Sequence, residues 1–278
     1  MKKGNQPTDG GSLLLSPEEK SELLQKELLA ERWLRPILGA DEFINGKERW
    51  CLWLMCIQPH ELKAMPEVMR RAMAVRDMRL ASSDPGTREL ANCPTQFREA
   101  HEYESYVLVP SVSSERREYV PMGLFDGHTI SSNLNLIIPG ATLYRFGVLT
   151  SAMHMAWMRS VCGRLKSDYR YSASIVYNNY PWPNAIMDKQ KQTIEAAAQA
   201  VLDARATYPD SSLAALYDPL TMQPELVKAH HKLDTAVDAV YSKRKFSGDS
   251  DRVALLFERY QQLVDGMEIK PAKTKGLN

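Results

Sequence analysis

Three charged residues stand at alternate positions in one short segment of the sequence. Lys166, Asp168 and Arg170 are separated by single residues, and Tyr169 and Tyr171 fall between and after them. In an extended segment alternate side chains point the same way, so this spacing predicts a charged row on one face and two anchoring tyrosines on the other. Lys and Arg donate to the edge of guanine, and Asp accepts from the amine of cytosine. The segment is therefore chemically suited to reading base edges, and the alternative is a solvated Lys–Asp surface pair.

The charge distribution supports a basic face in the middle of the chain. The net charge of the 278-residue sequence is only +1, which argues against a strongly basic nucleic-acid coat protein. Residues 110–183 nevertheless carry seven Lys or Arg against four Asp or Glu. Residues 1–109 are slightly acidic and residues 184–278 are balanced. The local excess is compatible with a nucleic-acid face and equally with a solvated one.

The elements that must position this segment begin with a capped helix. Ser16 to Glu19 form a capping box with Pro at the first helical position, and an amphipathic pattern continues until Pro36. Residues 46–57 predict a turn followed by a buried strand. Residues 66–82 repeat apolar side chains at helical spacing. The other face of that helix carries Arg70, Arg71, Arg76 and Arg79.

Strand patterns follow in the middle of the chain. Residues 103–109, 118–125 and 129–138 predict three strands, and Asp126-Gly127 predicts a tight hairpin between the last two. Residues 143–164 predict one helix that Gly163 ends.

The C-terminal third changes in character. A short strand is expected at Ile175–Tyr177, and the prolines at 181 and 183 stop it. Residues beyond Met187 are rich in Ala and poor in strand formers, which predicts three helices over residues 188–208, 224–241 and 250–267. We therefore expect an α+β domain over residues 1–185 and an all-helical domain over residues 186–278, with a frayed tail over 269–278.

No catalytic or metal site is expected. The sequence has no G-x-G-x-x-G fingerprint, no phosphate-cradling loop and no G-x-S-x-G elbow. His230 and Asp234 lie one turn apart, which indicates a solvated helix face, and His154 among apolar neighbours indicates a core histidine. Four cysteines lack metal-ligand spacing and are expected to be buried thiols: Cys51, Cys56, Cys93 and Cys162.

The composition also predicts a location. No apolar run approaches the ~18–20 residues that cross a bilayer, and no signal peptide is evident. We expect a cytoplasmic protein that does not contact a membrane.

Long strings of the sequence resemble the MmeI-like family of type IIL restriction-modification enzymes. The strings cover Tyr144–Arg159, Cys162–Ser172 and Ile175–Pro183, with shorter ones at Gly4–Gly11, Phe43–Gly46 and Ser113–Arg117. Those enzymes join a nuclease, a helical connector, an adenine methyltransferase that uses S-adenosylmethionine, a target recognition domain and a helical C-terminal domain. This chain resembles only the last two parts. The resemblance implies a mixed sheet-and-helix recognition domain followed by a helical domain.

The resemblance also implies roles for particular residues. The positions of Lys166 and Asp168 read one terminal base pair of the site together, with G on the recognised strand, and the position of Arg170 contributes to a neighbouring pair. A loop between strands supplies plausible phosphate contacts, with an ordinary capped loop as the alternative. Its residues are Ser113, Ser114, Arg116 and Arg117.

The implied function is sequence-specific recognition of double-stranded DNA. The chain would orient a methyltransferase domain or subunit, and a nuclease, while catalysing nothing and binding no cofactor itself. S-adenosylmethionine would belong to the methyltransferase domain. The alternative is a structural or interaction module of a larger assembly with no DNA affinity of its own, and salt-dependent DNA binding distinguishes the two.

Overall fold

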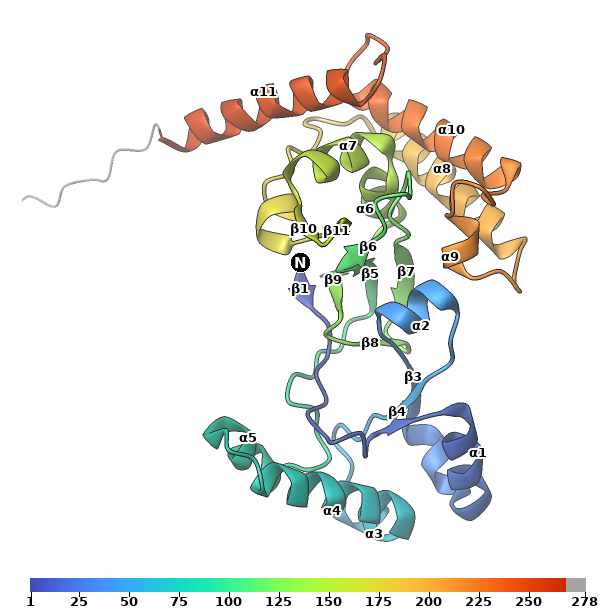
Figure 1. Cartoon of the computed structure of the whole chain (residues 1–278), viewed down its shortest axis with the longest axis vertical. Helices are drawn as coiled ribbons and strands as arrows, with labels where there is room; N and C mark the ends of the chain where they lie inside the picture. The colour runs from blue at the N-terminus through green and yellow to red at the C-terminus, as the bar shows by residue number, and fades with distance from the viewer. Residues whose placement is uncertain (269–278) are drawn as a thin grey trace, which may run out of the picture. The chain divides into compact units, whose positions relative to one another are not determined.

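The computed structural model describes residues 1–268, so the predicted fraying of residues 269–278 lies outside the described residues. The chain forms two compact units (Figure 1). Unit 1 contains residues 1–111, 121–141 and 210–215, and unit 2 contains residues 112–120, 142–209 and the described residues from 216 on. These units divide the chain differently from the predicted boundary at 185/186, which remains a prediction about domains.

Unit 1 contains a four-stranded antiparallel sheet. In spatial order its strands are β1 (Lys2–Lys3), β9 (Asn135–Pro139), β5 (Ser105–Pro110) and β7 (Gly123–Asp126). Helix α2 (Ala40–Asn45) packs Phe43 and Ile44 against this sheet.

The hairpin predicted at Asp126-Gly127 is wrong. Strand β7 pairs with β5 instead of with the following strand, and the N–H of Gly127 donates to the carbonyl oxygen of Glu104 at 3.0 Å. The reason is burial: residues 106–110 of β5 are all buried, so this apolar strand takes the central place between β7 and β9.

A second four-stranded sheet lies in unit 1. Its strands, in spatial order, are β2 (Leu14–Leu15), β4 (Trp50–Leu52), β3 (Leu34–Leu38) and the parallel β8 (Ile130–Ser131). The predicted strand over residues 46–57 is thus only three residues long, and the predicted third strand is divided between β8 and β9.

The predicted capping box of the first helix is confirmed, but the helix is shorter than its pattern. Ser16 and Glu19 exchange side-chain and backbone hydrogen bonds at the start of α1 (Pro17–Lys26). A 3₁₀ turn (Leu28–Trp33) follows and leads into β3, which contains Pro36. The helix ends at Glu27, whose backbone leaves the helical conformation with a φ of −141° and a ψ of 79°. The Glu27 carboxylate accepts from the N–H groups of Glu67 and Val68, which begin another helix.

The predicted helix over residues 66–82 is confirmed, with one correction to its polar face. It forms α4 (Pro66–Leu80), beside α3 (Pro59–Lys63), α5 (Pro85–Glu89) and a 3₁₀ turn (Leu90–Asn92). Arg79 is fully buried rather than exposed. Its guanidinium donates at 2.7–3.0 Å to five carbonyl oxygens, those of Pro7, Thr8, Leu90, Cys93 and Gln96.

The prediction of buried cysteines holds for one of the four. Cys51 is buried, and burial raises the pKa of its thiol to about 12. Cys56 and Cys93 are exposed because they lie in loops beyond β4 and after α5, and Cys162 is half-buried.

Unit 2 joins helices to a small sheet. Its sheet consists of β10 (Gly163–Leu165), β11 (Asp168–Arg170) and β6 (Val112–Ser113). The single helix predicted over residues 143–164 is two helices, α6 (Leu143–Thr150) and α7 (Ala152–Val161), because Ser151 is extended. The strand expected at Ile175–Tyr177 is instead a turn of π-helix (Ala173–Tyr177), whose start Ser172 caps.

The predicted helical C-terminal region is confirmed. It contains α8 (Asp188–Ala206), α9 (Leu213–Leu216), α10 (Pro224–Tyr241) and α11 (Asp249–Glu268), with α8 and α10 side by side (Figure 1). Helix α6 packs closely on this pair at Gly147, where an added Cβ would lie 2.9 Å from Ile194 and 3.3 Å from Leu233. The whole fold is α+β, and no helix over residues 1–268 is both long and apolar enough to cross a membrane.

Candidate nucleic-acid interface

The small sheet of unit 2 brings the two predicted contact segments together. Strands β10 and β11 form a hairpin in which Leu165 pairs with Asp168. Strand β11 also pairs with β6, with Tyr169 opposite Ser113. The segment with the predicted base readers therefore lies beside the start of the loop with the predicted phosphate contacts. The order β10-β11-β6 makes β10 an edge strand, and all three of its residues are exposed.

The structure corrects the predicted extended row at Lys166. Lys166 and Ser167 form the two-residue turn of the hairpin, so only Asp168 and Arg170 share a strand. The backbone of Lys166 has a φ of +56°, a conformation that favours glycine and costs other residues about 1–2 kcal/mol. The long side chain of Lys166 is thus exposed at the hairpin tip at some cost to the backbone.

The two predicted tyrosine anchors are buried. Tyr169 is 7% exposed and Tyr171 is 4% exposed, whereas Arg170 between them is exposed. The hydroxyl of Tyr171 lies 2.8 Å from Nε2 of His154, which is fully buried as expected for a core histidine. Burial lowers the pKa of His154 to about 3, so this ring is neutral and structural. The buried tyrosines hold β11 with its charged side chains on the opposite face.

The charged side chains around the hairpin fall into two groups. Arg164 donates to the carbonyl oxygen of Ser167 at 2.7 Å, pairs with Glu115 at 3.3 Å, and stacks 4.1 Å from the ring centroid of Tyr169. In contrast, no hydrogen bond or ion pair engages the side chains of the predicted base readers anywhere in the described part of the chain. These side chains are those of Lys166, Asp168 and Arg170. They remain available to an external partner.

The predicted phosphate contacts differ in their exposure and in the groups that lie near them. Arg116 is exposed and lies 3.8 Å from the carboxylate of Asp218. Arg117 is half-buried; burial lowers its pKa, and the nearby carboxylates of Asp168 and Asp218 oppose that shift. Ser114 accepts from the N–H of Arg116 at 3.3 Å. Arg117 is thus near Asp168, and Asp218 is near both arginines.

Ser113 fits a phosphate contact poorly. It is 3% exposed, and its hydroxyl oxygen is enclosed without a hydrogen-bond partner among residues 1–268. This burial follows from the pairing of β6 with β11. Ser113 is therefore the least supported of the four predicted phosphate contacts.

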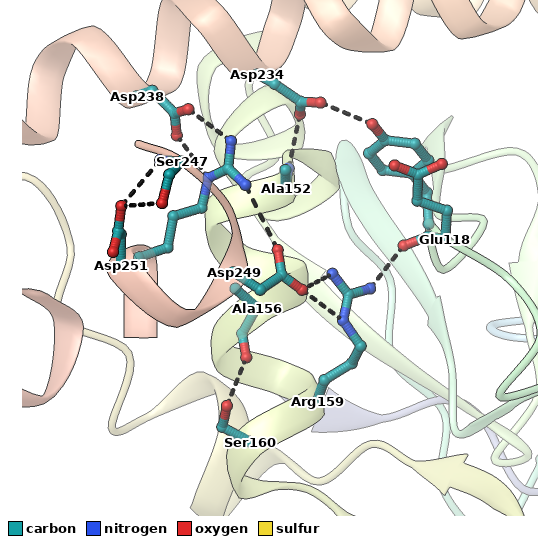
Figure 2. Close-up of polar contacts among 12 residues, drawn as sticks. Glu118, Ala152, Ala156, Arg159, Ser160, Asp234, Asp238, Ser247, Asp249 and Asp251 are labelled. Carbon is teal, nitrogen blue, oxygen red and sulfur yellow. Dashed lines mark hydrogen bonds and ion pairs between the residues drawn. The ribbon is translucent and has the colours of Figure 1, made fainter. Parts of the chain in front are cut away.

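The sequence-based prediction misses two buried polar side chains on α10. His230 is fully buried and Asp234 is 7% exposed, so the expected solvated helix face is wrong. The signal lies in the apolar spacing of Leu226, Leu233 and Val237, which places positions 230 and 234 on the same inward stripe of α10. Arg159 of α7 donates to the carbonyl oxygen of Glu118 (Figure 2).

Comparison with known proteins identifies the family. Residues 1–184 match the family described as "MmeI, target recognition domain", and residues 186–268 match "MmeI, C-terminal domain". The chain is similar to DNA methyltransferase A of Bacillus subtilis (strain 168), with 41% identity over 263 residues, 94% of this chain and 30% of that protein. It is also similar to a solved structure of the type IIL restriction-modification enzyme MmeI in complex with DNA. That match has 47% identity and a TM-score of 0.89, and covers 95% of this chain and 35% of the other.

The chain spans about a third of the length of both relatives. Within that span the match includes both the small sheet of unit 2 and the helices that follow it. The chain therefore belongs to the MmeI family, as a target recognition domain followed by a C-terminal domain.

Proposed function

We propose that this chain reads a specific sequence in double-stranded DNA and thereby positions an adenine methyltransferase and a nuclease of a restriction-modification system. The observation that carries the proposal is the β10–β11 hairpin, on which the side chains of Lys166, Asp168 and Arg170 make no hydrogen bond or ion pair within residues 1–268. A two-stranded ribbon fits the width of the DNA major groove. Membership of the MmeI family supports the same conclusion.

The chemistry of the hairpin tip matches one base pair. Lys166 donates to the ring nitrogen and carbonyl oxygen of guanine, and Asp168 accepts from the amine of the paired cytosine. Arg170, two residues further along β11, contributes to reading a neighbouring base pair. We therefore expect G on the recognised strand at the position that Lys166 reads.

The adjoining loop supplies contacts that are independent of sequence. Arg116 and Arg117 bind backbone phosphates beside the hairpin, with Ser114 as a further donor and Ser113 as the weakest candidate. The near neutrality of the chain does not oppose this, because the basic excess lies in residues 110–183.

The methyl-transfer chemistry belongs to another part of the enzyme. S-adenosylmethionine would be bound by the methyltransferase domain, into which the target adenine is flipped, since a stacked base is out of reach.

DNA binding by the 278-residue chain tests the proposal. The probe is a pool of duplexes with a randomised centre, and the readouts are the sequences retained and the salt dependence of binding. We expect enrichment of one site and a linear fall of log K with log salt, at about 0.9 per phosphate contact. Arg116→Ala should lower that slope by about one and weaken all sequences equally, whereas Arg70→Ala on α4 serves as a matched surface control.

The alternative role makes the opposite prediction. A structural or interaction module would retain no sequence and show no salt-dependent DNA affinity. Either result would contradict the proposed function.

A further inference from the structure

One buried carboxylate contacts both segments that lead to the candidate interface. Asp234, on α10, accepts a hydrogen bond from the N–H of Ala152 at 2.6 Å and another from the hydroxyl of Tyr119 at 2.7 Å (Figure 2). The residue is 7% exposed. Burying a carboxylate costs free energy, and these two hydrogen bonds offset part of that cost.

The first contact, with Ala152, fixes the start of α7, which precedes the hairpin in the chain. Ser151 occupies the cap position of α7, but its hydroxyl donates backwards to the carbonyl oxygen of Val148 and caps nothing. Asp234 supplies the missing cap from a different helix, where the helix dipole also favours its negative charge. Helix α7 ends at Val161, and only Cys162 separates it from β10. The start of the hairpin is therefore placed by α7.

The second contact, with Tyr119, fixes the end of the loop that carries the predicted phosphate contacts (residues 113–118, the phosphate-contact loop). Tyr119 follows directly after the segment that contains Arg116 and Arg117. Its ring stacks on His230 of α10, with centroids 4.0 Å apart, while its hydroxyl donates to Asp234. The loop is thus held at one end by the pairing of β6 with β11 and at the other by α10.

A second set of contacts joins the same two segments, α7 and the phosphate-contact loop, to α11. Arg159 of α7 donates to the carbonyl oxygen of Glu118 at 2.8 Å and to the Asp249 carboxylate at 2.6 Å. Arg252 then joins Asp249 to Asp238 of α10, at 3.4 and 2.7 Å (Figure 2). The C-terminal helices therefore hold α7 and the loop through charged groups as well as apolar packing.

We propose that Asp234 is a positioning residue for DNA readout, through which the C-terminal helices hold the hairpin and the phosphate-contact loop in register. The inference rests on the proposed function of the hairpin. It assigns the helical C-terminal domain a part in sequence recognition that does not require the domain to touch DNA.

Substitutions at Asp234 separate this role from bulk stability. Asp234→Ala removes both contacts. Asp234→Asn keeps both, because the amide oxygen accepts from Ala152 and the amide nitrogen donates to the Tyr119 oxygen. Tyr119→Phe removes only one. Asp203→Ala is the matched control, since that aspartate is exposed on α8 and, within residues 1–268, its carboxylate accepts a hydrogen bond from Gln199 of the same helix alone.

The measurement is the preference of each full chain for the enriched site over the unselected duplex pool. We expect Asp234→Ala to lower that preference by about tenfold or more while non-specific affinity changes little, and Asp234→Asn to restore it. Amide hydrogen exchange without DNA should quicken over residues 113–119 and 162–170 in the Ala variant and stay unchanged in the control.

Retained preference in a folded Asp234→Ala chain overturns the inference, as does an equal loss in Asp234→Asn. If the Ala variant does not fold, Tyr119→Phe decides: a lower preference supports the inference, and unchanged preference with unchanged exchange refutes it. A wild-type chain with no preference refutes the proposed function instead. In that event the exchange rates still show whether Asp234 holds the two segments.

Discussion

Removal of the negative charge at Asp234 should stabilise the protein in a pH-dependent way. Burial raises the pKa of this carboxyl from 3.8 to about 6, and the hydrogen bonds from Tyr119 and Ala152 and the charge of Arg252 only partly oppose the shift. A raised pKa means that the folded state prefers the protonated form. Its stabilising contribution is therefore complete below about pH 4 and is lost as the pH rises through 6.

The size of the effect follows from the shift. About two pKa units correspond to roughly 3 kcal/mol, at 1.36 kcal/mol per unit. Asp234→Asn keeps both hydrogen bonds but cannot ionise, so it should exceed the wild type by about 3 kcal/mol at pH 8 and equal it near pH 4. Roughly half of that difference should develop between pH 5 and pH 8.

Urea unfolding of the two chains at a series of pH values measures the difference directly. All other charged groups, including Asp238 on the same helix, are the same in both chains, so the comparison isolates the change at position 234. Asp203→Asn on the exposed face of α8 is the matched control for the substitution itself. A stability difference that is constant from pH 5 to pH 8 would refute the reasoning, because it would mean that Asp234 does not titrate in that range.

Three further substitutions test other parts of the account. Gly147→Val should lower the free energy of unfolding by about 1–3 kcal/mol, measured in urea, because its side chain would overlap Ile194 and Leu233. Arg79→Leu should cost about 3 kcal/mol or more in the same assay, since buried carbonyl oxygens lose their donors. Lys166→Gly should leave thermal stability unchanged or higher, since the turn relaxes, yet abolish the preference for G at one position in selection from randomised duplexes.

Local signals predict the start of α1 and helices α4, α8 and α10, because each of these signals is self-contained. The capping box at Ser16, the apolar spacing of α4 and the uninterrupted patterns of α8 and α10 all lie within one segment of chain. The family resemblance locates the candidate interface for a similar reason, since its strings run through the hairpin without a break.

The wrong predictions have a common cause: contacts with residues distant in the sequence prevail over the local signals. The Asp126-Gly127 turn is a sound hairpin signal, but β5 offers β7 a more apolar neighbour. Alternating charges predict an extended row, but the pairing of Leu165 with Asp168 puts Lys166 in the turn. The apolar spacing of α10 marks position 234 as inward, but the donors that satisfy its buried carboxylate lie 82 and 115 residues away, and no local pattern identifies them.

An exchange of the donor and acceptor at the hairpin tip tests the central claim most directly. The double variant Lys166→Glu with Asp168→Arg reverses the hydrogen-bonding character that faces the base pair. In selection from randomised duplexes, the preference at that position should change from G to C, with about 1–3 kcal/mol of discrimination and with the rest of the site unchanged. Lys166→Glu alone should abolish binding, because two carboxylates would face the acceptors of guanine. An unchanged G in the double variant, or a loss of preference at several positions at once, would contradict the assignment of these residues as base readers.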